Sequence, residues 1–270
     1  MRSFTVQVTG GALEAAWWGP GPAEAPTLVL LHEGLGCVAL WRDVPERLAA
    51  ATGWGVFAYS RSGYGRSTPA TLPRPLTYMH HEAQVVLPEV LEAAGIRRCA
   101  LVGHSDGGSI AAIYAGSAGS AAPPAPSSPA ILGLVTIAAH FFVEDINIAS
   151  IERIKVEYET GPLRAKLARY HDDVDGAFYG WNGAWLDPDF RRFDITGFLP
   201  GIQVPILGLQ GADDPYGTDE QLHVLKANVR APVEIALIPG AKHSPHLEAR
   251  DGTLAAITGF IAAIQRDFSS

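Results

Sequence analysis

Short apolar runs alternate with longer amphipathic stretches along most of this chain. Runs of strand length occur at 27–31, 56–59, 99–102, 131–137, 204–209 and 233–238. Helical spacing of apolar residues predicts helices at 41–51, 78–94, 108–114, 218–227 and 252–266. A strand that is apolar on both faces is typical of a parallel sheet with helices on both sides. The pattern therefore predicts an α/β fold with a mostly parallel, twisted sheet and right-handed crossovers.

Three stretches depart from this alternation. Residues 4–9 and 12–17 flank Gly10 and Gly11 and predict an antiparallel hairpin at one edge of the sheet. Residues 116–129 have a low-complexity composition, which predicts a mobile surface loop. Residues 141–199 are too long for a plain crossover and contain helical and aromatic segments. We expect a core of residues 1–140 and 200–270, with 141–199 inserted as a helical cap.

Composition excludes several classes of function. The chain has 270 residues, of which 47% are hydrophobic and 18% charged, enough apolar material for one large core. A net charge of −8 without a basic patch disfavours nucleic acid as a partner. No apolar stretch reaches membrane-spanning length, and no signal core precedes the first strand. We therefore expect a cytoplasmic protein with a small-molecule substrate and no membrane association, whereas nothing in the pattern predicts an oligomeric state.

Cysteine and histidine usage points away from metal chemistry. The two cysteines, Cys37 and Cys99, cannot build a disulfide framework, and their spacing from histidines does not resemble a zinc site. We expect neither a metal nor a cofactor.

One serine lies between a predicted strand and a predicted helix. Gly103-His104-Ser105-Asp106-Gly107 follows the apolar run 99–102 and precedes the small-residue helix at 108–114. A hydroxyl on a strained turn at a strand end projects into a cleft, and glycines two residues on either side permit so tight a turn. Ser105 is therefore the candidate nucleophile.

A serine hydroxyl needs a base to become nucleophilic, and the base needs a group that orients it. Gln210-Gly211-Ala212-Asp213-Asp214 follows one later strand, and Pro239-Gly240-Ala241-Lys242-His243 follows the next. Both loops lie at carboxyl ends of strands, on the same edge of the sheet as the serine. Asp213 and Asp214 are alternatives for the acid, and His243 and His246 are alternatives for the base.

The chain resembles the α/β-hydrolase family from Leu28 to the C-terminal helix. The resemblance rests on the order Ser, Asp, His and on the segments Leu31-His32-Glu33-Gly34-Leu35-Gly36 and Tyr59-Ser60-Arg61-Ser62-Gly63-Tyr64-Gly65-Arg66-Ser67. It implies a Ser-His-Asp mechanism whose motif positions fall on Ser105, His243 and Asp214. The Gly-x-x-Asp and Gly-x-x-His spacings favour Asp214 and His243, which leaves Asp213 as a turn carboxylate and His246 packed near a helix start.

The same resemblance locates an oxyanion hole. Backbone amides of Gly34 and of Asp106, the residue after the nucleophile, are expected to stabilise the charge that develops on a carbonyl oxygen. Glu33 occupies the position at which the family commonly has glycine, and it faces either the pocket or solvent. His32 is expected to orient this loop, and Arg61 to belong to a structural turn.

The substrate pocket is expected to include residues of the strand end and of the predicted cap. Candidates are Glu33, His140, Phe141, Phe178, Trp181 and Trp185, although each cap aromatic is individually favoured as cap core.

These features predict a serine hydrolase that cleaves a carboxylic ester of a small, apolar or aromatic substrate through an acyl-enzyme. Two other reactions use the same Ser-His-Asp arrangement. One is hydrolysis of a carbon–carbon bond, and the other is a triad-dependent lyase reaction of the menaquinone-pathway type. A small-molecule receptor with an idle triad is a further alternative. Serine at position 105 argues against dehalogenase and epoxide hydrolase chemistry, which uses aspartate there.

Overall fold

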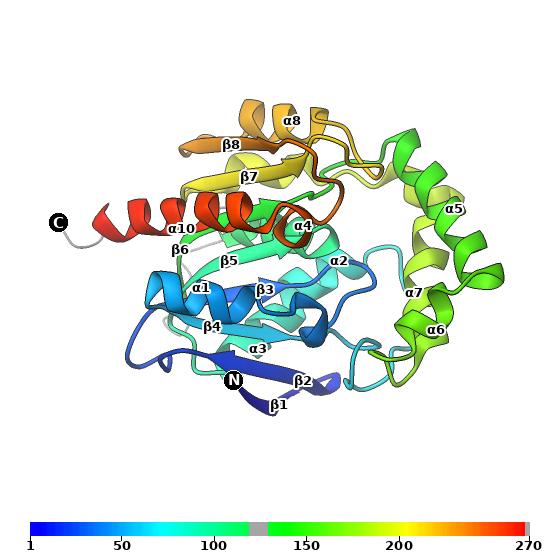
Figure 1. Cartoon of the computed structure of the whole chain (residues 1–270), viewed down its shortest axis with the longest axis horizontal. Coiled ribbons are helices and arrows are strands. Elements are labelled where there is room, and N and C mark those ends of the chain that lie inside the picture. Colours follow the sequence, from blue (N-terminus) through cyan, green and yellow to red (C-terminus); the bar gives the residue numbers. More distant parts are fainter. Residues whose placement is uncertain (119–128, 268–270) are drawn as a thin grey trace.

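A single eight-stranded sheet organises the chain in the computed structural model, which describes residues 1–118 and 129–267 (Figure 1). The strand order is β1-β2-β4-β3-β5-β6-β7-β8. Strands β1 and β2 are antiparallel to their neighbours, and all others pair in parallel. The strands are β1 (Arg2–Val8), β2 (Gly11–Trp18), β3 (Thr27–Leu31), β4 (Gly55–Tyr59), β5 (Arg98–His104), β6 (Ala130–Ile137), β7 (Ile206–Gly211) and β8 (Val233–Ile238). The predicted α/β class is thereby confirmed.

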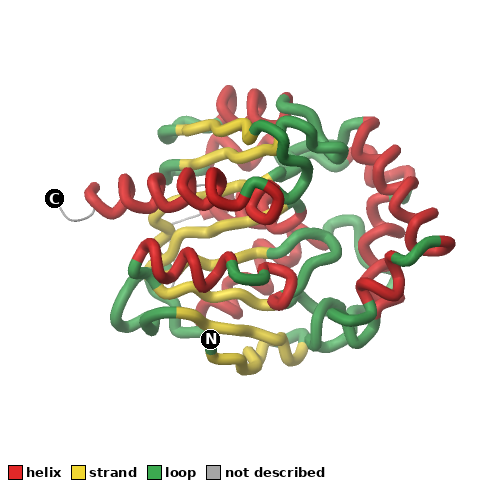
Figure 2. The backbone as a smooth tube through the Cα atoms, in the orientation of Figure 1, coloured by secondary structure: helices red, strands yellow, loops and turns green. Residues whose placement is uncertain are grey.

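Alternate strand residues face two separate apolar layers, because successive side chains of a strand point to opposite faces. Leu28 and Leu30 of β3 pack into the layer beneath α1 (Val44–Thr52) and α10 (Arg250–Asp267). Val29 and Leu31 pack into the other layer, which α3 (Leu87–Ala93), α4 (Asp106–Ala118) and α8 (Glu220–Asn228) cover. Both faces of the sheet are therefore buried, as the continuous apolar runs predict (Figures 1 and 2).

Helix boundaries differ from the sequence expectation in places. The predicted helix 78–94 consists of α2 (Tyr78–His81), a wide π-type turn at Glu82–Val86, and α3. The helix after the serine runs on to Ala118, so the first residues of the predicted loop 116–129 are helical and most of the rest lies outside the described residues. Short 3-10 helices span Val38–Trp41, Pro188–Arg192 and Thr196–Gly201, and α9 spans Pro245–Glu248.

Helices of the segment 141–199 extend beyond the carboxyl ends of the strands. They are α5 (Asp145–Thr160), α6 (Leu163–Leu167) and α7 (Val174–Trp185), at the right of Figure 1. We call 141–199 the cap segment. Tyr158 of α5 stacks on Phe178 of α7 with ring centroids 3.6 Å apart, so aromatic packing holds these two helices together.

The direction of the strand order reverses between β3 and β5, which are parallel neighbours with Leu31 opposite Gly103. Ligands of open α/β sheets bind at such a switch point, outside the carboxyl ends of the strands. The loops after β3 and β5 therefore lie side by side, and those after β7 and β8 emerge at the same edge. None of the helices in 1–118 and 129–267 is long and apolar enough to cross a membrane.

Candidate functional site

Ser105 occupies a strained turn between β5 and α4. Its φ is 52°, in the left-handed region that residues other than glycine rarely adopt. The Ser105 amide donates to the Ile137 carbonyl at 2.8 Å, and the Ser105 carbonyl accepts from the Gly108 amide at 2.8 Å. Backbone bonds to β6 and to the first turn of α4 thus stabilise the strained conformation.

Two glycines are required around this turn because the backbone packs against itself. A Cβ atom at Gly103 would lie 2.2 Å from the Gly107 carbonyl oxygen, and one at Gly107 would lie 2.0 Å from the Leu31 carbonyl oxygen. No side chain fits at either position. The sequence signature of the elbow therefore has a steric cause in this fold.

The buried Asp214 and the partly buried His243 form a hydrogen-bonded pair after the ends of β7 and β8. His243 Nδ1 lies 2.9 Å from Asp214 Oδ2 and 3.0 Å from Oδ1. The Tyr216 amide donates to Oδ1 at 2.8 Å, and Gln210 Nε2 lies 3.4 Å from Oδ2. Burial alone raises the pKa of Asp214, but the hydrogen bond and charge of His243 outweigh it, so the pKa is lowered. The carboxylate therefore holds the His243 proton on Nδ1 and leaves Nε2 free.

The alternatives for the acid and base separate by their contacts. Asp213 is exposed, whereas Asp214 is buried behind the His243 ring. His246 lies in α9, packed against Trp41 and His104 with ring centroids 5.1 and 4.6 Å away. Among the described side chains, Asp214 and His243 are the acid and base candidates that hydrogen-bond one another.

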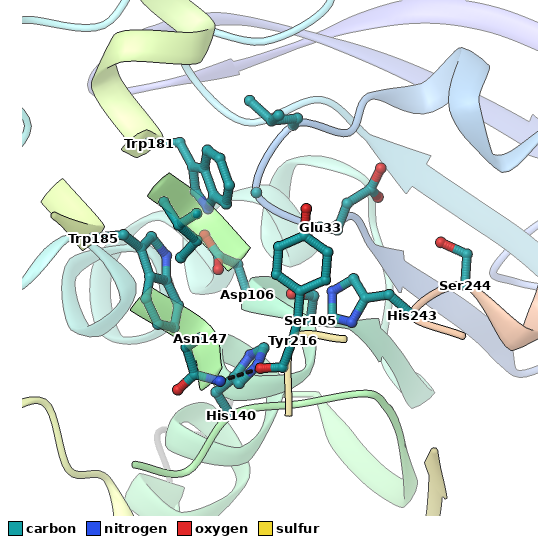
Figure 3. A pocket seen from close by; sticks show the side chains of 13 residues that line it. Glu33, Ser105, Asp106, His140, Asn147, Trp181, Trp185, Tyr216, His243 and Ser244 are labelled. Carbon is teal, nitrogen blue, oxygen red and sulfur yellow. Dashed lines mark hydrogen bonds between the residues drawn. The ribbon is translucent and has the colours of Figure 1, made fainter. Parts of the chain in front are cut away.

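A cavity of about 220 Å³ opens beside Ser105. Figure 3 shows the Ser105 side chain next to the His243 ring, with Trp181, Trp185 and Asp106 on the other side of the serine. Of the residues singled out in the sequence, the cavity wall contains Glu33, Gly34, Ser105, Asp106, His140, Trp181, Trp185 and His243. The structure therefore brings together residues from the ends of β3, β5, β6 and β8 and from α7.

Phe141 and Phe178, also expected in the pocket, do not line this cavity. Phe178 is fully buried against Tyr158 within the cap segment. Phe141 is 1% exposed, and its backbone bonds Gln221 and Ile195 instead of leading into the cavity. Composition and spacing identify the aromatic cluster but not the helix face that each ring occupies, so the expectation for these two residues was wrong.

Sequence reasoning missed five residues of the wall. They are Leu35, Asn147, Ile151, Tyr216 and Ser244. Tyr216 follows Asp214 by two residues, and its ring lies 4.6 Å from that of His243. Proximity to the acid and base loops was a usable signal for Tyr216 and Ser244. Asn147 and Ile151 enter through the folding of α5 over the strand ends, for which the chain carries no local signal.

Hydrogen bonds to His32 and Arg61 fix the loop after β3. His32 is buried; its Nδ1 lies 2.7 Å from the Glu33 carbonyl, and its Nε2 accepts from the Arg61 amide at 3.0 Å. The buried Arg61 guanidinium donates to the His32 carbonyl and, at 2.9 Å, to the Glu33 carbonyl. Carbonyls of this loop thus point at Arg61, and the adjoining residue Gly34 lies in the cavity wall.

Glu33 lines the cavity but directs its carboxylate toward His104. Glu33 Oε2 lies 3.4 Å from His104 Nδ1, and His104 Nε2 lies 2.7 Å from the His243 carbonyl. Burial raises the pKa of Glu33, but the interaction with His104 outweighs it and lowers the pKa below its ordinary value. Glu33 therefore connects the loop after β3, through His104, to the backbone of His243.

Within residues 1–118 and 129–267, no group of histidine, cysteine, aspartate and glutamate side chains is arranged to hold a metal ion. The described residues therefore offer no metal centre near Ser105.

Comparison with known proteins agrees with this fold. Residues 26–151 match the family model of the alpha/beta hydrolase fold. A carboxylesterase structure of the Thaumarchaeon Nitrososphaera gargenis superimposes with a TM-score of 0.75 at 17% identity, covering 98% of this chain and 100% of that one. The chain has the α/β-hydrolase fold.

Two sequence relatives match parts of the chain. A bifunctional esterase/perhydrolase, DCH of Acinetobacter calcoaceticus, is 27% identical over 234 residues, covering 72% of this chain and 76% of that protein. RutD of Stutzerimonas stutzeri strain A1501, whose assigned role as a carbamate hydrolase is itself provisional, is 38% identical over 87 residues. That match covers 32% of this chain and 31% of RutD, so the chain spans about a third of this relative's length.

Proposed function

We propose that this α/β-hydrolase is a serine hydrolase that cleaves a carboxylic ester of a small substrate through an acyl-enzyme on Ser105. One observation carries the proposal. Asp214 Oδ2 lies 2.9 Å from His243 Nδ1. The His243 ring lines the same cavity as Ser105, whose backbone is strained with a φ of 52°. This is the arrangement in which a histidine accepts a serine proton and a carboxylate stabilises the resulting imidazolium.

The reaction runs in two halves. Ser105 Oγ attacks the ester carbonyl carbon while its proton passes to His243 Nε2. The tetrahedral intermediate collapses by breaking the bond to the alcohol oxygen, which takes the proton from Nε2. Water then loses a proton to Nε2 and attacks the acyl carbon, and the departing Ser105 oxygen takes that proton back.

Backbone amides of Gly34 and Asp106 supply the oxyanion hole in this proposal. Asp106 is the first residue of α4, so its amide has no carbonyl partner within the helix and stands at the positive end of the helix dipole. Gly34 follows β3, the parallel neighbour of β5, and both residues lie in the cavity wall. Loss of one such donor commonly costs about 2.7 to 4 kcal/mol of transition-state stabilisation.

Cavity size and walls support a small, apolar or aromatic substrate. About 220 Å³ lies below the range of roughly 300–1,000 Å³ usual for drug-sized ligands. Its apolar surface comes from Leu35, Ile151, Trp181, Trp185 and Tyr216. The names of the Acinetobacter esterase/perhydrolase and the Nitrososphaera carboxylesterase support an ester as the bond cleaved.

Turnover of p-nitrophenyl acetate and butyrate tests the proposal. We expect Ser105→Ala to reduce kcat/KM to the uncatalysed background while the fold is retained. Ser117→Ala, near the far end of α4 on the surface, serves as the matched control and should keep wild-type turnover. Undiminished activity of Ser105→Ala would exclude the acyl-enzyme mechanism.

A further inference from the structure

The turn that carries Gly34 is fixed at one end by the core of the protein. The Glu33 carbonyl accepts from Arg61 Nη2 at 2.9 Å and from the Gly36 amide at 3.1 Å. The C=O and N–H of a trans peptide point in opposite directions, so the Gly34 amide is directed away from the buried Arg61. The direction of this proposed oxyanion donor therefore depends on how the turn 33–36 is held.

A residue of the cap segment holds the other end of the turn. His171 lies between α6 and α7 and is 4% exposed. Its Nε2 lies 3.0 Å from the Leu35 carbonyl, and its Nδ1 accepts from the Gly65 amide at 2.9 Å. Leu35 directly follows Gly34 and lies in the cavity wall. One cap side chain thus bonds the turn that carries the proposed oxyanion donor.

Gly65 provides the His171 ring with a fixed point in the loop after β4. The Gly65 carbonyl accepts from the Asp172 amide at 3.0 Å, so both backbone groups of Gly65 bond the cap segment. The φ of Gly65 is 58°, and a Cβ atom there would lie 2.2 Å from Glu14 Oε2 of β2. The Ser60 hydroxyl donates to the same Glu14 oxygen at 2.7 Å. The ring therefore extends from a tightly packed loop to the turn after β3.

The two bonds of His171 require a neutral imidazole with its proton on Nε2. A backbone amide can only donate, so Nδ1 is bare, and a carbonyl can only accept, so Nε2 carries the proton. Burial is the largest influence on His171 and lowers its pKa below the ordinary value, which keeps the ring neutral near pH 7. The acceptor and the donor of one rigid ring thus join the loop after β4 to the turn after β3.

We propose that His171 is a positioning residue, which uses the fixed loop after β4 to orient the turn that directs the Gly34 amide. This inference rests on the proposed ester hydrolysis. It makes the cap segment part of the catalytic geometry as well as a wall of the cavity. His171 is not among the described residues that line the cavity, so we expect its loss to act on kcat and not on substrate binding.

Two substitutions at position 171 separate its two hydrogen bonds. In His171→Asn the side-chain oxygen can accept from the Gly65 amide, but the side chain ends short of the Leu35 carbonyl. In His171→Gln the side-chain nitrogen can donate to that carbonyl, whereas no acceptor faces Gly65. We expect His171→Asn to lower kcat for p-nitrophenyl butyrate about 10- to 50-fold with KM within about twofold, because a displaced oxyanion donor weakens transition-state binding. His171→Gln should stay within about threefold of the wild-type kcat, since the turn remains bonded.

Urea unfolding distinguishes this role from a merely structural one. Each variant loses one buried hydrogen bond, so both should unfold at a lower urea concentration than the wild type, but only His171→Asn should lose kcat. The exposed His223→Gln is the control and should keep wild-type stability and kcat. Wild-type kcat in His171→Asn, or equal losses in the two variants, would overturn the inference. A loss of kcat above about tenfold in folded His171→Gln would also overturn it, which covers the case in which His171→Asn does not fold.

The wild-type protein offers a test that needs no substitution. In histidine-labelled protein at pH 8, ¹⁵N NMR should find the ring proton of His171 on Nε2 and none on Nδ1. A proton on Nδ1 would be incompatible with the bond from the Gly65 amide and would overturn the inference.

Labelling of Ser105 by a fluorophosphonate separates this inference from the proposed reaction. The phosphonyl oxygen occupies the oxyanion hole although no ester is cleaved, so the labelling rate should fall about tenfold in His171→Asn and little in His171→Gln. Ser105-dependent ester hydrolysis with equal labelling rates in wild type and His171→Asn would overturn only the positioning role. Slower labelling of His171→Asn in a protein that hydrolyses no ester would overturn only the proposed reaction.

Discussion

The Trp181 indole nitrogen lies 2.1 Å from the point at which a Cβ atom on residue 34 would stand. A side chain of α7 in the cap segment thus packs directly onto the loop that follows β3. Glycine is required at position 34 for this contact, independently of any special backbone angle. The relationship couples the position of the cap to the geometry of the proposed oxyanion hole.

Gly34→Ala should therefore displace Trp181 or the loop. We expect a loss of kcat of about 10²-fold, because removal or misplacement of one oxyanion donor typically has this effect. Trp181→Ala in the same chain removes the clashing ring and should restore part of the loss. The measurement is steady-state hydrolysis of p-nitrophenyl butyrate by both single variants and the double variant. Strictly additive losses would contradict the coupling.

Asp214→Asn should lower kcat by about 10³- to 10⁴-fold, because an amide cannot hold the Nδ1 proton of His243 as the carboxylate does. Asp213→Asn is a close control, since it removes the adjacent but exposed carboxylate. We expect that control to stay within about twofold of the wild type. A larger loss for Asp213→Asn than for Asp214→Asn would reverse the assignment of the acid.

Arg61→Lys keeps the positive charge but loses the fork that reaches two carbonyls of the loop after β3. We expect kcat for p-nitrophenyl butyrate to fall about 10- to 100-fold with a smaller change in KM, because the loop carrying Gly34 shifts. The exposed Arg66→Lys is the matched control. Wild-type kcat in Arg61→Lys would show that this fork does not position the loop.

Strand boundaries and the turn around Ser105 are the features that local sequence could predict. Strands β3 and β8 coincide with their predicted ranges, because a proline directly before each of them, Pro26 or Pro232, limits where the strand can begin. The elbow is equally local, since its glycines are imposed by backbone contacts on either side of Ser105.

Pocket walls were harder to predict because they depend on tertiary packing. Phe178 and Trp181 are three residues apart on α7, yet the first packs inward on Tyr158 and the second faces the cavity. Asn147 reaches the cavity only because α5 folds over the strand ends. No periodicity within the chain distinguishes these outcomes.

Buried neutral histidines make stability depend on pH. Burial, with a smaller contribution from His104, lowers the pKa of His246 well below its ordinary value. Below pH 6.5 the unfolded chain binds a proton at this residue and the folded protein does not, so stability is lost as the pH falls. From pH 8 to 5.5 this one group should cost about 1.4 kcal/mol of unfolding free energy.

Urea unfolding of wild type and His246→Gln at these two pH values measures that contribution. The wild type should lose about 1.4 kcal/mol more than the variant. The exposed His223→Gln should keep the wild-type pH dependence. Parallel losses in wild type and His246→Gln would show that His246 does not remain neutral in the folded protein.

Covalent labelling by a fluorophosphonate tests the activation of Ser105 most directly. Intact-protein mass spectrometry and peptide mapping should find one phosphonate, on Ser105, formed rapidly in the wild type. Labelling should vanish in Ser105→Ala and slow by orders of magnitude in His243→Ala, as the general-base role requires. An unlabelled wild-type protein, or labelling at the same rate without His243, would contradict the catalytic account and favour a receptor with an idle triad.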